Sequence, residues 1–142
     1  MPRLAGERIP EMPSKTFQLG DVLTVTTGRL LTVGEDGNGI SRLYELLEHM
    51  TGEPPYTHSL GRFSEECKPY LMLAFPQLEI ANQRLPVLDE MLKIMPADKA
   101  CTVWLEALYP DVGREFDVEP IPADAHESRH PVAELVSMMN RT

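Results

Sequence analysis

Cysteine, aromatic residues and long apolar runs are scarce in this chain of 142 residues. Its two cysteines, Cys67 and Cys101, do not make a disulfide framework, so we expect a reducing compartment. No run approaches the roughly 18 apolar residues that a membrane-spanning helix requires, and the first residues lack the apolar core of a signal peptide. These absences predict a soluble protein of the cytoplasm with no membrane segment.

Recognisable cofactor and metal motifs are also missing. The glycine-rich turn at 34–39 lacks the lysine and the strand–helix setting of a phosphate loop. His126 and His130 have a spacing that would place two metal ligands on one face of a helix. Their segment is flanked by prolines, however, and Glu127 does not complete the zincin pattern. We therefore predict no metal and no cofactor.

Basic side chains are in short supply, with 13 Lys and Arg against 22 Asp and Glu, for a net charge of −9. An acidic surface repels a phosphate backbone, so direct nucleic-acid binding is not expected. The same charge suits solubility and a basic protein partner. Between Asp111 and Glu127, six acidic residues face Arg114 alone. A solvated acidic loop is the simpler interpretation of that segment, and mimicry of a nucleic acid is the alternative.

Proline, in contrast, is abundant, with 13 residues spread along the chain, above the usual share of about 5%. The chain length and the 42% of hydrophobic residues suit one globular core. We predict a mainly α-helical single domain over 17–142, built from about five or six short helices punctuated by proline. Residues 1–16 are expected to form an extended or disordered arm.

Apolar spacing locates the first helices. The clearest runs from Ile40 to Thr51, with Asn38 as the expected N-cap and Gly52 ending it in a left-handed conformation. Residues 19–27 are ambiguous. Their apolar spacing favours a helix, whereas their run of Val and Thr favours a strand.

A kinked pair of helices is expected next. Ser59 can cap a helix through Cys67, and Pro69 should prevent an unbroken continuation because it lacks an N–H and clashes with the preceding turn. The second member of the pair should then stop near Pro76.

The remaining chain predicts shorter elements. Helices are expected over 85–95 and from Asp98 to 108, where Tyr109-Pro110 should close the second. Within an acidic loop or strand segment over 110–130, residues 115–119 alternate polar and apolar, as in a short strand or hairpin. A C-terminal helix is expected over 131–140. Its inward-facing residues should be Val132, Leu135, Val136 and Met139.

Several short motifs stand out between Phe17 and Leu78. They are Leu19-Gly20-Asp21-Val22-Leu23, Thr26-Thr27-Gly28-Arg29-Leu30-Leu31, Met50-Thr51-Gly52, Thr57-His58-Ser59-Leu60 with Arg62, Glu66-Cys67 with Pro69, and Phe75-Pro76-Gln77-Leu78. In this combination the chain resembles a family of small uncharacterised proteins encoded by bacteriophages and prophages. The resemblance implies a phage origin and a protein of short helices, and it brings no established activity. Ser59 departs from the family pattern, which has Gln after the histidine.

The candidate functional residues are Arg29, His58, Arg62, Thr27 and Cys67. Arg29 follows a glycine that would let a ligand approach closely, although a cation at a helix C-terminus is the simpler interpretation. His58 and Cys67 have the chemistry of a catalytic base and nucleophile. The sequence supplies neither an orienting group nor an oxyanion site, so hydrogen bonding at a helix start and core packing are the simpler roles.

Three functions remain open. The leading hypothesis is a small acidic phage or prophage protein that binds a host or phage protein in the bacterial cytoplasm. The first alternative is a small enzyme using His58 with Arg29, Arg62 or Cys67, which requires those side chains to converge in one pocket. The second is a structural or accessory phage protein that associates with itself as a homo-oligomer.

Overall fold

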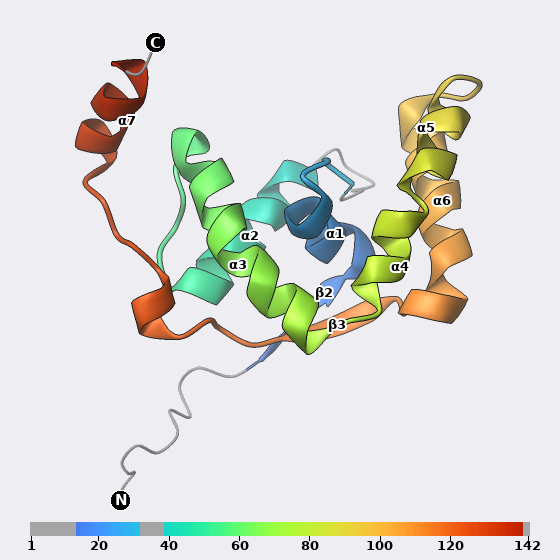
Figure 1. Cartoon of the computed structure of the whole chain (residues 1–142), viewed down its shortest axis with the longest axis horizontal. Coiled ribbons are helices and arrows are strands. Elements are labelled where there is room, and N and C mark those ends of the chain that lie inside the picture. Colours follow the sequence, from blue (N-terminus) through green and yellow to red (C-terminus); the bar gives the residue numbers. More distant parts are fainter. Residues whose placement is uncertain (1–13, 32–38, 141–142) are drawn as a thin grey trace, which may run out of the picture.

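The computed structural model describes residues 14–31 and 39–140, and the chain there is mainly α-helical (Figure 1). The described helices are α1 (Leu19–Thr27), α2 (Gly39–Thr51), α3 (Leu60–Ala74), α4 (Leu78–Gln83), α5 (Leu85–Leu92), α6 (Ala97–Val112) and α7 (Pro131–Met139). They are joined by two short strands, β2 (Lys15–Gln18) and β3 (Glu115–Val118), and two 3-10 turns, η1 (Thr57–Ser59) and η2 (Ala123–Ala125). Every helix in the described ranges is too short to cross a membrane.

Helix α1 lies at the centre of the fold. It contacts α2, α3, α4 and both strands, and residues 19–26 are all buried. A helix enclosed on every side has no polar face to maintain, which is why a run of Val and Thr is accommodated there. The helical interpretation of residues 19–27 is therefore confirmed. Figure 1 shows α5 and α6 at one end of the long axis and α7 at the other.

The chain reverses tightly after α1. Gly28 ends the helix with a left-handed φ of 78°. The Thr24 hydroxyl donates to the Gly20 carbonyl at 2.7 Å and accepts the Leu31 N–H at 2.9 Å. Leu31 thereby folds back so closely that a Cβ on Gly20 would lie 2.6 Å from the Leu31 carbonyl oxygen. Gly20, Thr24 and Gly28 therefore have structural roles in this turn.

The predicted strand at 115–119 is confirmed, and its partner is N-terminal. β3 pairs antiparallel with β2, with Lys15 opposite Val118, and it turns Phe116 and Val118 into the core. The sheet thus reaches two residues into the arm expected over 1–16, because the Thr16 hydroxyl and backbone are bound to β3. Residues 1–13 of that arm lie outside the described residues.

The α2 prediction is confirmed, with Gly52 at a left-handed φ of 82°. Asn38, its expected cap, lies outside the described residues. Two other expected caps differ: the Ser59 hydroxyl bonds to Tyr56 rather than to α3, and Asp98 lies inside the first turn of α6.

The predicted helix end near Pro76 is confirmed, since α3 ends at Ala74, but the predicted helix ends at Pro69 and Pro110 were wrong. α3 continues through Pro69, and α6 continues through Pro110. In α3, the residues Phe63, Cys67 and Leu71 are buried at intervals of four and lie on both sides of Pro69. Packing of that face against the core outweighs the missing hydrogen bond of an exposed proline.

The prediction for the C-terminal helix was wrong about its orientation. α7 forms where expected, but Val132, Leu135 and Val136 are 62%, 42% and 48% exposed, and Met139 is 66% exposed. The one buried residue of α7 is Glu134. The helix therefore turns its charged side toward the domain and its apolar side toward solvent.

We expect Gly20→Ala to destabilise the protein by about 1–3 kcal/mol, because the added methyl group collides with backbone that cannot move freely. Thermal unfolding followed by circular dichroism measures the loss. The matched control is Gly61→Ala in α3, where an added Cβ meets nothing within 4 Å. That change should leave stability equal or raise it, and equal effects of the two substitutions would contradict the close approach of Leu31.

Candidate functional site

Five charged side chains that are far apart in sequence meet beside α3. They form what we call the polar cluster: Glu53, Arg62, Glu66, His126 and Glu134. Glu53 follows α2, Arg62 and Glu66 lie one turn apart on α3, and the other two belong to the segment that follows β3. The cluster therefore joins the C-terminal segment to the body of the domain.

His126 lies between two carboxylates. Its Nδ1 is 2.6 Å from Glu66 Oε1 and its Nε2 is 2.6 Å from Glu53 Oε1. Its ring packs against the Phe63 ring in a T-shaped arrangement, with 4.8 Å between centroids. Because both neighbours are acceptors, the ring satisfies them only as a doubly protonated imidazolium. Burial disfavours that charge, but the hydrogen bonds to Glu66 and Glu53 outweigh it and raise the pKa of His126 above its usual 6.5.

Arg62 binds the first half of α7 through Glu134. Its Nε donates to Glu134 Oε2 at 2.8 Å and its Nη2 donates to Glu134 Oε1 at 3.1 Å, a bidentate pair. The Nη1 group donates to Glu66 Oε2 at 3.2 Å and to the Glu127 carbonyl. The hydrogen bond from Arg62 lowers the pKa of Glu134, whose side chain is only 5% exposed. Glu134 therefore remains a buried carboxylate.

Further bonds hold the backbone between these two contacts. The Glu127 N–H donates to Glu66 Oε2 at 3.0 Å, and the Ser128 hydroxyl donates to Glu53 Oε2 at 3.2 Å. Upstream, Ile121 is buried and its N–H donates to the Met50 carbonyl at 2.9 Å. The part of the predicted acidic loop that follows β3 is thus fixed to α2 and α3.

Of the predicted site residues, His58 and Arg62 come together. His58 stacks on Tyr56, and its Nε2 lies 4.0 Å from Glu134 Oε1, beside the Arg62 contact. Arg29 lies elsewhere, paired with Asp89 of α5 at 2.5 Å. Since α5 and α7 occupy opposite ends of the molecule (Figure 1), a site joining Arg29 with His58 is not formed.

The other two candidates have structural environments. The Thr27 hydroxyl donates to the Leu23 carbonyl at 2.6 Å and accepts the Arg29 N–H at 3.2 Å, so it closes the end of α1. Cys67 is fully buried in the core face of α3. Burial, with the nearby charge of Glu66, raises the pKa of this thiol to about 12. It is therefore protonated at neutral pH, whereas nucleophilic catalysis needs a thiolate.

Sequence reasoning missed Glu53, Glu66 and Glu134 and misjudged His126. The spacing of Arg62 and Glu66, four residues apart on a helix, was the one readable sign of an ion pair. His126 was weighed only with His130, which instead accepts the Ala133 N–H at the start of α7. Among the described residues, no group of three or more His, Cys, Asp or Glu side chains is arranged to hold a metal ion.

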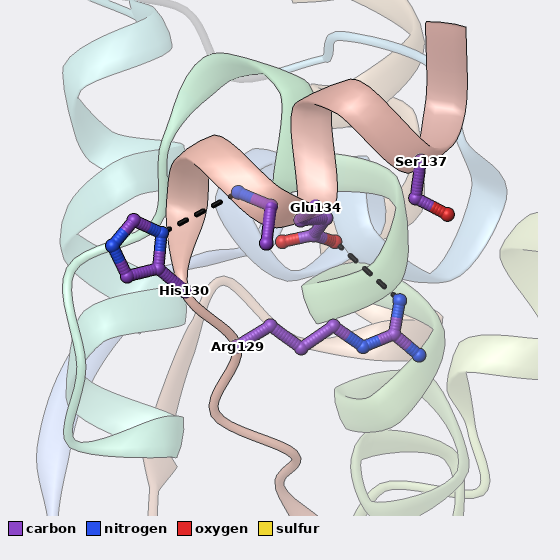
Figure 2. A pocket seen from close by; sticks show the side chains of 5 residues that line it. Arg129, His130, Glu134 and Ser137 are labelled. Atoms are coloured by element: carbon purple, nitrogen blue, oxygen red, sulfur yellow. Dashed lines mark hydrogen bonds and ion pairs between the residues drawn. The ribbon is translucent and has the colours of Figure 1, made fainter. Parts of the chain in front are cut away.

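A pocket lies against the polar side of α7 (Figure 2). In Figure 2 the Arg129 side chain extends toward Glu134, at an Nη1–Oε2 distance of 3.9 Å. The residues that line the pocket are Arg129, His130, Ala133, Glu134 and Ser137. All belong to α7 or the two positions before it, so the pocket is a local feature of this segment.

Residues 17–81 match the model of a family described as a domain of unknown function, DUF7736. The match includes α1 to α3 with Arg62 and Glu66, and it ends before the segment that carries His126 and Glu134. Neither a curated protein nor a solved structure matches the chain.

We expect Arg62→Met to release α7 while the rest of the fold remains. A buried carboxylate that loses its cation costs about 3–5 kcal/mol, and detachment of α7 lets Glu134 return to water. Hydrogen exchange should therefore rise across residues 131–139. Arg84→Met is the matched control, because the Arg84–Asp111 pair is largely exposed and such pairs contribute little. Unchanged protection of α7 in Arg62→Met would contradict the role of the ion pair.

We expect Cys67 to resist alkylation in the folded protein at about pH 8, because burial keeps its thiol protonated. Peptide mass spectrometry after iodoacetamide treatment measures the rate at each cysteine. Cys101, which is only partly buried, provides the internal comparison. If Cys67 reacted as fast as Cys101, it would have the reactivity that the Cys–His enzyme hypothesis requires.

Proposed function

We propose that the protein acts by binding another protein and that α7 is the helix that docks. The supporting observation is the outward apolar stripe of α7, formed by Val132, Leu135 and Val136 and extended by Met139. A chain gains stability by burying such residues, and half-exposing each of them forgoes roughly 1 kcal/mol. A stripe held in solvent by a buried ion pair on the opposite side is better explained by a partner that covers it.

The spacing of the stripe supports a helix-in-groove mode of binding. Its residues fall at i, i+3, i+4 and i+7, the pattern by which an amphipathic helix inserts into a hydrophobic groove. The charged residue of α7, Glu134, lies on the other side and is already paired with Arg62. Docking would therefore bury apolar side chains without desolvating a new charge.

The size of the stripe favours an enclosing partner over a second copy of this chain. Four partly exposed side chains offer on the order of a few hundred Å² of apolar surface. A stable protein interface buries about 800 Å² on each partner. Two copies that met only through α7 would fall well short of that area, whereas a groove that wraps the helix also contacts its flanks.

The net charge of the chain further limits the classes of partner that α7 could bind. At −9, two copies repel each other, and an anionic membrane surface repels the chain. α7 also lacks the Lys and Arg residues that membrane-surface helices carry on their polar face. The best-matched occupant is an apolar groove with a basic rim on a host or phage protein. The phage setting and the bacterial host rest on the motif resemblance, and the cytoplasmic location rests on the scarcity of cysteine.

The enzyme alternative has weaker support. Its remaining members are His58 and Arg62, on either side of Glu134. The Arg62 guanidinium is already engaged by Glu134, Glu66 and the Glu127 carbonyl. A substrate would have to displace those bonds before it met the cation.

We expect the double variant Leu135→Asp, Val136→Asp to lose a protein that the native chain captures from bacterial extract. Placing charges in an apolar groove should reduce binding at least about tenfold, because each side chain contributes 1 kcal/mol or more when buried. Capture is quantified by mass spectrometry, and the complex is then rebuilt from the purified partner. Val87→Asp, at an exposed position of α5, is the matched control and should bind as the native chain does.

Three outcomes would overturn the proposal. Equal capture by the native chain and the double variant would separate binding from α7. Native-chain dimers in light scattering that the double variant abolishes would make the occupant a second copy. Binding of the native chain, but not the variant, to vesicles with anionic lipid would make it a membrane surface.

A further inference from the structure

α7 is too short to remain helical without support. It has nine residues, whereas isolated helices below about 12–15 residues are marginal in water. Most helices in proteins owe their stability to an apolar face packed on the core, but the apolar side of α7 faces solvent. Its stability must come from the polar contacts that fasten it and the preceding segment to the domain.

Those contacts form in two places. Glu134 within α7 is held by Arg62, and the segment before α7 is held through His126. From Glu119 to His130 the only regular structure is η2. The bonds from the Glu127 N–H and the Ser128 hydroxyl go to Glu66 and Glu53, the same two carboxylates that bind His126. If His126 loses its hydrogen bonds to Glu53 and Glu66, the segment that precedes α7 is less firmly attached to the domain.

The two hydrogen bonds of His126 require that its ring be doubly protonated. From α3, Glu66 contacts Nδ1 and the Phe63 ring packs against the imidazole, while Glu53 from the loop after α2 contacts Nε2. Arg62 touches the far oxygen of Glu66, and Glu127 from the same segment is the other acid nearby. A neutral imidazole has one N–H, so one of the two carboxylates would face a lone pair instead of a donor.

We propose that His126 is a proton-operated latch that controls whether α7 is presented. When His126 is protonated, its hydrogen bonds to Glu53 and Glu66 hold the C-terminal segment on the domain, and α7 remains attached with its apolar stripe facing outward. Without the proton, one of these bonds is replaced by repulsion, the segment detaches, and α7 loses its helical structure. This inference about regulation rests on the proposed function of α7 as the docking helix.

The direction of the pH effect follows from the pKa shifts. The pKa of His126 is raised in the folded state, so its contribution is complete below about pH 6.5 and is lost as the pH rises through the folded value. The pKa of Glu134 is lowered by Arg62, so its contribution is present above about pH 4.5 and is lost at more acidic pH. The attachment of α7 to the domain is therefore most stable between about pH 4.5 and 6.5. Above that range, binding of the partner should be coupled to protonation of His126.

A nitroxide on α7 tests the latch in the free, full-length protein. Ser137→Cys, in a Cys101→Ser background, places the label off the apolar stripe, and Cys67 is buried. From about pH 6 to about pH 9 we expect the mobile fraction of the label to rise at least about tenfold, as expected for loss of one charge-assisted hydrogen bond. The midpoint should coincide with that of the His126 ring signals in an NMR titration.

His126→Gln supplies the matched variant, because its side chain carries no charge at any pH. Its α7 label should be mobile at both ends of the range. A second label at Glu90→Cys, on α5, should remain equally mobile at every pH and in both backgrounds, which shows that the domain stays folded. If His126→Gln unfolds globally, the coincidence of the two midpoints in the native background decides the outcome.

A label with the same mobility across the range, or a midpoint that differs from that of the His126 ring, would overturn the latch. These results do not depend on a partner. If α7 melts as expected while Leu135→Asp, Val136→Asp still captures the native partner, the latch stands and the docking role fails. If capture requires the stripe but the label ignores pH, the docking role stands and the latch fails.

Discussion

The bidentate contact between Arg62 and Glu134 determines which side of α7 meets the rest of the molecule. Moving an ionised carboxylate out of water costs several kcal/mol unless a cation with matching geometry receives it. A guanidinium with four of its N–H groups engaged supplies that geometry. Once Glu134 is inside, helical geometry places Val132, Leu135 and Val136 outside. The exposed stripe is thus a consequence of one ion pair.

Much of the helical framework could be predicted from the sequence, because local spacing carries that information. Apolar residues every three or four positions located α2 and α5, and alternation located β3. The errors arose where tertiary packing outweighed a local rule. Pro69 and Pro110 lie inside helices because buried residues on both sides of each proline hold the helix against the core. The ambiguity of α1 disappeared because that helix is enclosed on all sides.

The candidate site was predicted only in part, for a related reason. Arg62 stood out as a cation near a helix start, and its spacing from Glu66 was readable from the sequence. Glu53 and His126 are brought together from 73 positions apart, and no local pattern encodes that contact. The orientation of α7 failed in a more instructive way. Amphipathic spacing identifies an apolar side, but it does not say whether the core or a partner covers that side.

Attachment through polar contacts is well suited to a helix whose apolar side is to remain available to a partner. If apolar contacts attached α7 to the domain, its apolar stripe would pack against the core and would not be available to a partner. A second apolar side would not solve this, because a helix that is apolar on every side is normally buried in a core. Charged contacts avoid this problem because their geometry selects one face of the helix. They also respond to protons, as apolar packing does not. The ion pair of Arg62 with Glu134 fixes the orientation of α7, while His126 between Glu53 and Glu66 makes its attachment reversible. Orientation and release are therefore separate properties, held by different residues of one cluster.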